Sequence, residues 1–426
     1  MSPTVPFSLK NCKIINMEIY LVGGAVRDKL LGLKPVEFDW VVVGASVDDM
    51  TALGYQQVGK DFPVFLHPQT HDEYALARTE RKTAAGYKGF EVHANPDVTL
   101  EQDLLRRDLT INAIAEDKDG NIIDPYNGQE DLKQGLLRHV SDAFIEDPVR
   151  ILRIARFAAR FSKYGFRTAH TTHALMKTMV SNGEVDALVS ERVWAETHKA
   201  LGTDHPAKYF NVLRACGALQ RIFPEIDNLF GVPQPAKHHA EIDTGIHVMM
   251  VLEQACLLSD DTQVRFAALT HDLGKATTDT DILPSHHGHE QRGLDLIKAM
   301  CSRLKIPGEF RDLALATSHY HSHCHRARDL KASTIVKTLK GLDAFRRPQK
   351  FEKFLLACFA DARGRKGHSK DNYPQADFFR QALAACEAID NQEFIQQGLQ
   401  GKAIAEAIDQ ARIKAVKNVQ KAFNLG

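Results

Sequence analysis

One stretch decides the fold of the first part of this chain: Tyr20-Leu21-Val22-Gly23-Gly24-Ala25-Val26-Arg27-Asp28, followed by Glu37-Phe38-Asp39-Trp40-Val41-Val42-Val43. The pattern predicts a strand, a glycine turn, a short helix and a second strand. Glu37 and Asp39 are two residues apart, so an extended backbone presents both carboxylates on one face. Paired carboxylates suit a hard divalent cation, and a Gly-Gly turn before a helix exposes N–H groups to phosphates. The segment therefore indicates nucleotide chemistry.

Two further motifs follow, Arg106-Arg107-Asp108-Leu109-Thr110-Ile111-Asn112-Ala113 and Glu146-Asp147-Pro148-Val149-Arg150. In order and spacing, the motifs between residues 18 and 160 resemble the class II tRNA nucleotidyltransferase and poly(A) polymerase family. That family usually has Asp at the first acidic position, whereas this chain has Glu37. Glutamate still supplies oxygens to a metal, on a longer and more flexible side chain.

The resemblance implies that Glu37 and Asp39 are catalytic and hold Mg²⁺. One ion would lower the pKa of a tRNA 3′-hydroxyl, and another would neutralise the triphosphate and the departing pyrophosphate. The alternative for the pair is two exposed acids at the start of a strand. Glu73 is a candidate third carboxylate on a neighbouring strand, with a surface strand acid as its alternative.

The same resemblance assigns nucleotide phosphates to the Gly24 backbone and to Arg27, although Arg27 can instead pair with Asp28. The polar stretch 79–89 lies where the family has a mobile loop linked to addition of the last nucleotide.

In the second motif the family implies that Arg107 binds the triphosphate and Asp108 the sugar. The alternative is that Asp108 is the N-cap of a helix-like segment, Leu109–Ala115, and that the arginines are solvated.

The third motif resembles the family's protein template, in which Asp147 and Arg150 imitate a Watson–Crick edge for the incoming C or A. Arg153 and Arg156 continue that face toward the nucleotide. At 100° per residue, the helix expected over residues 148–164 has one cationic face and one apolar face. The cationic residues are Arg150, Arg153, Arg156, Arg160 and Lys163, and the apolar ones are Ile151, Ile154, Phe157, Ala158 and Phe161. A solvated face is the alternative to phosphate binding.

His271-Asp272-Leu273-Gly274-Lys275 resembles the central signature of HD-family phosphohydrolases, with His247 and Asp361 in the positions of the outer ligands. Several imidazoles favour a late first-row metal such as Ni²⁺. The resemblance implies phosphatase, 2′-nucleotidase and 2′,3′-cyclic phosphodiesterase activity. Further imidazoles lie at 286–289 and at His319. The cluster at 319–325 has irregular spacing, and a solvated loop is favoured over an adventitious zinc site.

The predicted fold class is α+β, a small mixed-sheet nucleotidyltransferase head followed by an all-α neck, body and HD-domain tail. Short strands are expected at 19–22, 40–43, 64–66, 74–77 and 121–124, with a hairpin turn at 119–121. The expected segments are an N-terminal extension (1–16), the head (17–147), a helical neck and body for nucleotide selection and tRNA binding (148–240), the HD domain (241–365) and a helical tail (366–426).

The composition of the chain restricts where the protein acts and how it binds RNA. The formal net charge is zero, so RNA contacts must come from local basic surfaces. Seven cysteines without a CxxC pair fit a reducing compartment, and no apolar run is long enough to span a bilayer. A cytoplasmic protein without a membrane partner is expected, acting as a monomer or a homodimer.

Together these features predict an enzyme that adds and repairs the 3′-terminal CCA of tRNA from CTP and ATP, without a nucleic-acid template, and that carries an HD hydrolase. One alternative is a poly(A) polymerase, although such relatives typically carry a strongly basic C-terminal extension and residues 403–426 are only mildly basic. The other is a metal-dependent nucleotide hydrolase with a non-catalytic head.

Overall fold

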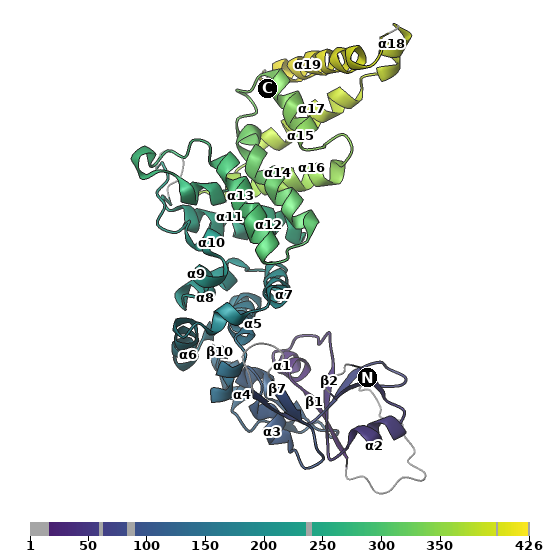
Figure 1. Ribbon diagram of the computed structural model, residues 1–426, viewed down its shortest axis with the longest axis vertical. Coiled ribbons are helices and arrows are strands. Elements are labelled where there is room, and N and C mark those ends of the chain that lie inside the picture. The colour runs from purple at the N-terminus through teal and green to yellow at the C-terminus, as the bar shows by residue number, and fades with distance from the viewer. Residues whose placement is uncertain (1–16, 59–62, 83–89, 236–240, 398, 425–426) are drawn as a thin grey trace. The chain divides into compact units, whose positions relative to one another are not determined.

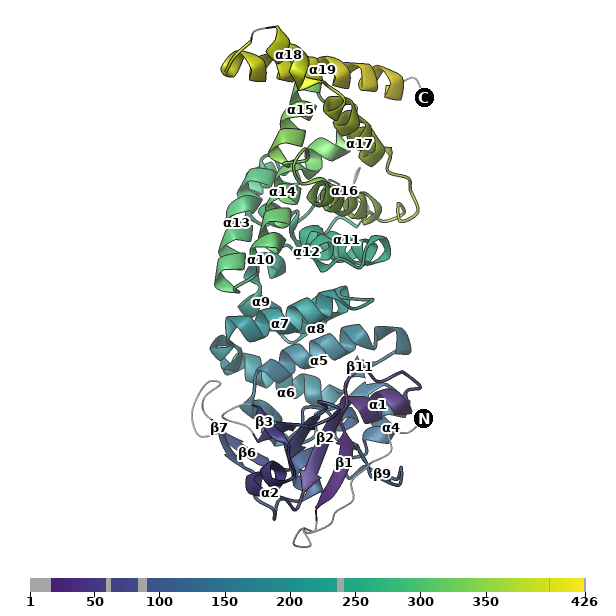
Figure 2. The ribbon, with the colours of Figure 1, turned by 90° about the vertical axis from the view of Figure 1, so that its right-hand side faces the viewer.

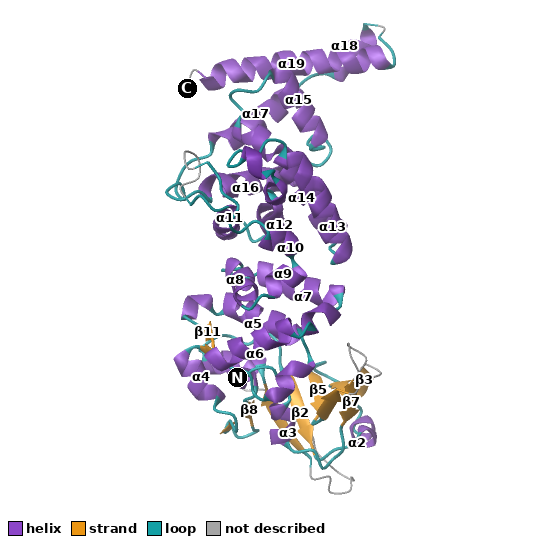
Figure 3. Cartoon of the chain, turned by 60° about the vertical axis from the view of Figure 1, so that its left-hand side comes forward, coloured by secondary structure: helices purple, strands orange, loops and turns teal. Residues whose placement is uncertain are grey.

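The computed structural model describes residues 17–58, 63–82, 90–235, 241–397 and 399–424, and the chain divides into two compact units after Leu188. The expected extension 1–16 and residues 83–89 of the expected mobile loop lie outside the described residues. Among those described, strands occur only in the first unit and the second is built of helices (Figures 1 and 3). The α+β prediction is confirmed. The expected neck and body, 148–240, is shared between both units.

A mixed sheet forms the centre of the first unit, and Figure 2 shows its strands β1 and β2. Its seven strands lie in the order β3-β4-β5-β2-β1-β8-β9. Within this sheet, β2 and β5 are parallel and the other described neighbours are antiparallel. The strands are β1 (Glu18–Val22), β2 (Asp39–Val43), β3 (Gln56–Val58), β4 (Val64–Leu66), β5 (Glu73–Leu76), β8 (Ala115–Glu116) and β9 (Ile122–Ile123). The five expected strands are confirmed with small shifts at their ends, and the turn at 119–121 joins β8 to β9. Small two-stranded sheets pair β6 (Thr79–Lys82) with β7 (Phe90–His93), and β10 (Leu136–Leu137) with β11 (Arg167–Thr168).

Strand β2 is covered on both faces. Its side chains alternate, so Val41 packs in one cluster with Leu104 of α3 (Leu100–Leu105), and Val42 in another with Met50 of α2 (Val47–Ala52). Ser46 and Thr99 begin these two helices with capping boxes, each completed by the residue at the third helical position. This packing fixes the strand that begins with Asp39.

The remaining helices of the first unit are α1 (Gly24–Leu30), α4 (Gly128–Gln134), α5 (Val149–Arg160) and α6 (His170–Ser181), with short 3₁₀ turns η1 (Thr110–Asn112), η2 (Asp142–Glu146), η3 (Ser162–Tyr164) and η4 (Glu184–Ala187). The predicted apolar face of α5 is confirmed, since Ile151, Ile154, Phe157, Ala158 and Phe161 are all buried.

Two local predictions were wrong. Glu37 is not on a strand, because the antiparallel partner β1 ends at Val22 opposite Asp39 and the chain turns away at Gly23. The segment 109–115 is not a helix. The backbone N–H of Leu109 bonds to the Asp108 side chain and that of Thr110 to the Arg138 carbonyl, leaving only the 3₁₀ turn η1 before β8.

The second unit is helical. Its helices are α7 (Ser190–Leu201), α8 (Ala207–Ala215), α9 (Ala218–Ile222), α10 (Pro224–Asp227), α11 (Thr244–Leu258), α12 (Thr262–Thr270), α13 (His289–Arg303), α14 (Gly308–His325), α15 (Ala332–Gly341), α16 (Pro348–Arg363), α17 (Pro374–Glu387), α18 (Asn391–Gln396) and α19 (Lys402–Asn424), with 3₁₀ turns η5 (Leu273–Thr277) and η6 (Thr280–Ile282).

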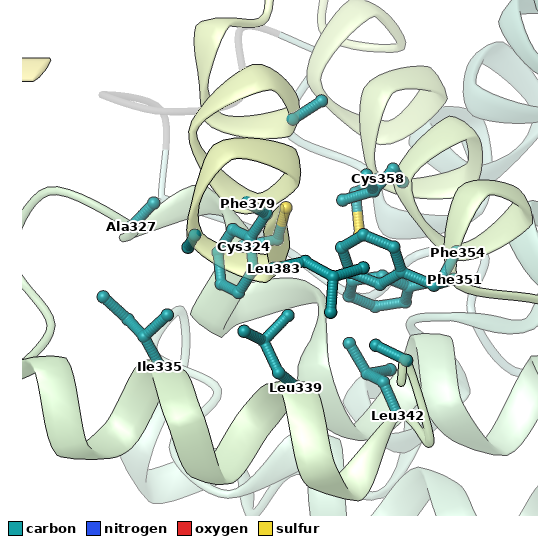
Figure 4. Packing of buried hydrophobic residues seen from close by; sticks show 14 of the residues in the cluster. Cys324, Ala327, Ile335, Leu339, Leu342, Phe351, Phe354, Cys358, Phe379 and Leu383 are labelled. Carbon is teal, nitrogen blue, oxygen red and sulfur yellow. The ribbon is translucent and has the colours of Figure 1, made fainter. Parts of the chain in front are cut away.

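A large apolar core joins helices α14 to α17 and α19, and Figure 4 shows Phe351 and Phe354 of α16 facing Leu339 of α15 and Leu342, which directly follows that helix. Of the helices that the structure describes, none is both long and apolar enough to cross a membrane.

A closed ring of charged hydrogen bonds ties α5 to the rest of the first unit. Arg160 Nη2 donates to Asp28 Oδ2 (2.8 Å), and Asp28 Oδ1 accepts from Arg27 Nη2 (2.7 Å). Arg27 Nη1 donates to Asn112 Oδ1 (2.6 Å). Asn112 Nδ2 donates to Asp108 Oδ1 (2.9 Å), and the other oxygen of Asp108 accepts from Arg153 Nε (2.6 Å), which returns to α5.

Arg27 is the most deeply buried cation of this ring, at 3% exposure. Its guanidinium lies 5.2 Å from the Phe157 ring centroid and 5.1 Å from that of Phe161, both within cation–π range. Burial lowers the pKa of Arg27, and the neighbouring Asp28 carboxylate opposes this effect. Asp28 is therefore the counter-ion that keeps a buried charge tolerable.

We predict that Asp28→Ala destabilises the first unit by about 3–5 kcal/mol, because it leaves the buried Arg27 charge without its carboxylate. Lys29→Ala is the matched control, because Lys29 is on the same helix as Asp28. It removes a more exposed ion pair with Glu116 of β8 and costs less than about 1 kcal/mol. Urea unfolding of the full chain measures both, with hydrogen exchange assigning the transition to residues 17–188. Equal effects of the two substitutions would contradict the role given to Asp28.

Candidate active sites of the two units

Three carboxylates gather at the start of two parallel strands in the first unit. Asp39 is the first residue of β2, and its register partner on β5 is Glu73, which is exposed. Glu37 lies two residues before the strand and is also exposed. Partial burial raises the pKa of Asp39, Arg107 opposes this, and the Glu37 charge adds to it. The structure thus brings all three acids predicted from the sequence to one edge of the sheet.

The glycine turn and Arg107 are in close contact. Gly23 has a φ of +69°, and a Cβ there would lie 2.8 Å from Arg107 Nη1. Arg107 Nη2 donates to the buried Asp103 (3.1 Å), while its Nε is buried with no hydrogen-bond partner among the described residues. A side chain at position 23 would therefore displace this guanidinium, whose positive charge acts on the Asp39 carboxylate.

Arg27 and Gly24 occupy different environments. Arg27 is held by Asp28 and Asn112, which matches the ion-pair alternative for this residue. Gly24 begins α1 directly after the turn and is partly exposed. Contact of either residue with a nucleotide phosphate stays a prediction.

Asp108 is buried at 7% exposure, and its oxygens accept from Arg153, Asn112 and its own neighbour Leu109. Burial alone would raise the pKa of Asp108, but the Arg153 charge and the hydrogen bonds from Asn112 and Arg153 hold it below its usual range. Asp108 does not cap a regular helix, and contact with a nucleotide sugar stays a prediction.

The template residues lie at the beginning of α5. Asp147 Oδ1 accepts the N–H of Val149 (3.1 Å), so Asp147 has a cap-like position before the helix. Arg150 is buried and donates to the carbonyls of Ala143 (3.0 Å) and Arg106 (2.7 Å). Arg156 lies over the Phe157 ring, 4.4 Å from its centroid. These contacts orient the side chains, while base recognition by Asp147 and Arg150 stays a prediction.

In the second unit, four predicted metal ligands meet in one buried cluster: His247 comes from α11, Asp361 from α16, and His271 and Asp272 directly follow α12. His247 Nε2 lies 3.1 Å from Asp361 Oδ1, and His271 Nε2 lies 3.6 Å from the same oxygen. Asp272 Oδ2 is 3.1 Å from His271 Nε2 and 4.0 Å from His247 Nε2. The side chains of these four residues are between 0% and 7% exposed.

The histidines of this cluster are oriented for ligation. His271 Nδ1 bonds to the Ala268 carbonyl (2.8 Å), and His247 Nδ1 faces the Glu241 carboxylate (2.9 Å). Because those oxygens only accept, each Nδ1 carries a hydrogen and each Nε2 lone pair points into the cluster. Metal-binding histidines are held in this way.

The charge balance also fits a cation. Burial opposes protonation of His271, but the nearby Asp272 and Asp361 carboxylates outweigh burial and raise its pKa to about 10. Its Nε2 and Asp272 Oδ1 are buried with no hydrogen bond of good geometry to a described residue. The cluster therefore contains donor atoms that a divalent metal would satisfy.

Three further histidines reach this cluster that the sequence analysis did not assign to it: His289 at the start of α13, and His321 and His325 on α14. The expectation of a solvated loop at 319–325 was wrong, because this segment is the last turns of a helix and His321 is 4% exposed. The i,i+4 spacing of His321 and His325, which places both on one helix face, was the available signal. Of the other imidazoles, His286 bonds to Thr278 and to the Pro233 carbonyl.

Comparisons with known proteins agree with this architecture. Residues 19–138 match the family described as Poly A polymerase head domain, residues 165–230 the one described as Probable RNA and SrmB-binding site of polymerase A, and residues 244–347 the HD domain. The multifunctional CCA protein of Thioalkalivibrio sulfidiphilus is 63% identical over 404 residues, covering 95% of this chain and 99% of that protein. The chain belongs to the multifunctional CCA protein family.

Other members and solved structures are consistent with this assignment. The multifunctional CCA protein of Teredinibacter turnerae is 58% identical over 95% of this chain and 99% of its own length. A CCA-adding enzyme in an apo form has a TM-score of 0.66 at 21% identity, covering 94% of this chain and 88% of that one. The Thermotoga maritima CCA-adding enzyme complexed with tRNA has a TM-score of 0.65 at 20% identity, covering 96% and 92%. At such identities these structures show the shared fold.

We predict that Arg153→Ala destabilises the first unit by about 1–3 kcal/mol near pH 7. Asp108 has a lower pKa in the folded protein than its unfolded value of about 3.9, so its charged form contributes stability above that pH. This contribution is lost as the pH falls through the folded-state pKa, and the difference between wild type and variant therefore shrinks below about pH 4.

Urea unfolding at a series of pH values measures this effect. Arg167→Ala, an exposed arginine on β11, is the control and is expected to show a small difference that does not depend on pH. A penalty for Arg153→Ala that is constant between pH 7 and pH 3 would show that the Asp108 pair does not carry it.

Proposed function

We propose that this CCA-adding enzyme joins CTP and ATP to the tRNA 3′ end at the acidic edge formed by β2 and β5, and that its HD cluster separately hydrolyses phosphoesters. The observation that supports the first site is the placement of Asp39 beside Glu73, with Glu37 and Arg107 close by. The names of the relatives and the matched head domain support nucleotide addition.

In the head, the carboxylates of Glu37 and Asp39 would hold Mg²⁺, whose positive charge favours the ionised hydroxyl and stabilises the triphosphate. Arg107 is positioned to bind the triphosphate next to the glycine turn. The 3′-hydroxyl oxygen bonds to the α-phosphorus, and the bond from that phosphorus to the diphosphate breaks. Holding the 3′-hydroxyl and the α-phosphate aligned, with water excluded, accounts for much of the rate enhancement in reactions of this kind.

In this proposal Asp147 and Arg150 select the incoming nucleotide. The Asp147 carboxylate would accept, and the Arg150 guanidinium would donate, hydrogen bonds at the edge of the base. The contacts of Arg150 with two backbone carbonyls keep its guanidinium in a fixed position, which is what a template requires. Arg153 is committed to Asp108, so its contribution to selection is to position rather than to bind the base.

In the second unit, His247, His271, Asp272 and Asp361 would hold a divalent metal, and Ni²⁺ suits this imidazole-rich set. Such an ion supplies an activated water for attack on phosphorus. His325 donates from Nε2 to Asp361 Oδ2 (2.6 Å) and so orients that carboxylate. The reactions proposed for this site are phosphatase, 2′-nucleotidase and 2′,3′-cyclic phosphodiesterase chemistry.

We predict that Asp39→Ala abolishes nucleotide addition and leaves phosphoester hydrolysis within about twofold of wild type. Asp272→Ala is expected to do the reverse, because the two clusters belong to separate units. Incorporation of labelled CTP and ATP into tRNA and hydrolysis of a 2′,3′-cyclic nucleotide measure the two activities. Loss of both activities in either variant, with circular dichroism unchanged, would contradict separate sites.

We further predict that Arg150→Ala and Arg150→Lys relax the choice among nucleotides by at least about tenfold while Mg²⁺ dependence stays unchanged, since lysine retains the charge but lacks the planar fork. Ratios of kcat/KM for CTP, ATP, GTP and UTP measure this selectivity. Arg167→Ala is the control. Unchanged selectivity in both variants would show that Arg150 does not select the nucleotide.

The two alternatives make different predictions in the same assays. A poly(A) polymerase would extend its product with A alone and without a fixed length, whereas CCA addition incorporates C before A and stops after three nucleotides. A hydrolase with a non-catalytic head would show hydrolysis and no transfer by the wild-type chain. The HD domain matched in this chain and the names of its relatives favour CCA addition.

A further inference from the structure

Asp103, near the end of α3, is a buried carboxylate that two arginines share. It is 0% exposed, and Arg106 and Arg107 follow it at the three- and four-residue spacings that bring side chains together on a helix. Its Oδ2 accepts from Arg107 Nη2 (3.1 Å). Its Oδ1 accepts from Arg106 Nη2 (2.6 Å) and Nε (3.0 Å). The two oxygens of one carboxylate therefore hold two different guanidinium groups.

The charge of Asp103 is what holds these arginines. Burial alone would raise the pKa of Asp103, but the charges of Arg106 and Arg107 outweigh burial and keep that pKa below its usual range. Asp103 is therefore ionised, and a buried anion is tolerated only while its cations stay in place. A neutral side chain of the same shape would remove the attraction that positions both arginines.

Arg107 is the arginine assigned to the triphosphate. Its Nη1 donates to the Asn112 carbonyl at 3.4 Å, longer than a typical N–H···O hydrogen bond, and lies beside the glycine turn at Gly23. The bond from Nη2 to the Asp103 carboxylate is shorter and joins two charged groups, so it is the stronger of these contacts. Asp103 thus sets the position of the Arg107 guanidinium next to the turn.

Arg106 connects the same carboxylate to the residue proposed to select the base. Its Nε also donates to the Arg78 carbonyl (3.1 Å), and the N–H of Arg78 donates to Asp103 Oδ1 (3.3 Å). The backbone carbonyl of Arg106 accepts from Arg150 Nη2 (2.7 Å). The position of Arg150 therefore depends on a backbone group that Asp103 holds through the Arg106 side chain.

We infer that Asp103 is a positioning residue for nucleotide addition, whose one carboxylate places both the arginine that binds the triphosphate and the arginine that selects the base. The inference rests on the proposed function and deepens it. Because Asp103 is fully buried, it acts through Arg107 and Arg106 and not by touching the nucleotide. A single substitution at this position should consequently weaken nucleotide binding and relax nucleotide choice together.

The test compares Asp103→Asn with Glu101→Gln in the full chain. The amide of Asp103→Asn keeps the shape of the side chain but can accept at only one oxygen. We expect KM for CTP and ATP to rise, and the preference for them over GTP and UTP to fall, each by about tenfold, the scale of one charge-assisted hydrogen bond. Glu101→Gln makes the same chemical change at an exposed position of α3 and is expected to change neither quantity.

A second variant, Arg106→Lys, separates the two effects. Arg107 keeps its bond to Asp103 in this variant, whereas lysine cannot bind the Arg78 carbonyl and the carboxylate with a planar guanidinium. We expect nucleotide choice to relax while KM for CTP and ATP stays within about twofold of wild type, since triphosphate binding is retained. Circular dichroism and thermal melting verify the fold of each variant, and Arg106→Lys decides the inference if Asp103→Asn does not fold.

A residue that only supports the fold would lower the fraction of active protein. In that case kcat would fall equally for all nucleotides, with KM and nucleotide choice unchanged, and this result in Asp103→Asn would overturn the inference. Unchanged nucleotide choice in Arg106→Lys would overturn it as well.

Arg150→Ala, measured alongside, tests the proposed template separately. If Arg150→Ala relaxes nucleotide choice and Asp103→Asn changes neither quantity, the proposed function stands and the inference is rejected. If Arg150→Ala leaves nucleotide choice intact, the proposed template is rejected, and KM for CTP and ATP in Asp103→Asn alone decides the role of Asp103.

Discussion

The first unit depends on the charged ring that joins α5 to α1 and η1. Three arginines and two aspartates share it, and Asn112 connects them by donating to one carboxylate and accepting from a guanidinium. Buried charges are tolerated only when paired and hydrogen-bonded, so each member constrains the others. The ring fixes α5 relative to α1, which follows the glycine turn, and to η1.

The two units differ in how their buried charged and polar groups are paired. In the first unit arginines and aspartates satisfy one another, and the acids proposed for catalysis stay at the exposed sheet edge. In the second unit carboxylates and imidazole nitrogens are buried together, and several lone pairs point at one another. The first arrangement is satisfied by the protein's own groups, whereas the second contains donor atoms that a bound cation would satisfy.

The sequence predicted what is local and could not predict what depends on distant partners. The glycine turn, the amphipathic α5 and the HD signature are each contained in one short segment of the sequence. The structure has the turn at Gly23 and the helix α5 with its apolar face buried. The cationic face of α5 looked free of acids because its partners are remote: Asp28 lies 132 residues from Arg160, and Asp108 lies 45 residues from Arg153.

The contacts of the histidines in the second unit also depend on segments that are distant in the sequence. His289 and His321 reach Asp272 because Gly274 and Gly293 have no side chains, so η5, α13 and α14 can pack closely. No single segment of the sequence reveals these contacts. The segment 109–115 was mistaken for a helix because its backbone donors bond to the Asp108 side chain and to the Arg138 carbonyl, which periodicity alone does not report.

The most direct measurement is a crystal structure of the full chain with CTP and Mg²⁺. The account predicts the triphosphate beside the glycine turn and in contact with Arg107, with a carboxylate oxygen of Asp39 about 2.1 Å from magnesium and the Arg153–Asp108 pair intact. A nucleotide bound elsewhere, with Asp39 and Glu37 making no contact to the metal, would contradict it.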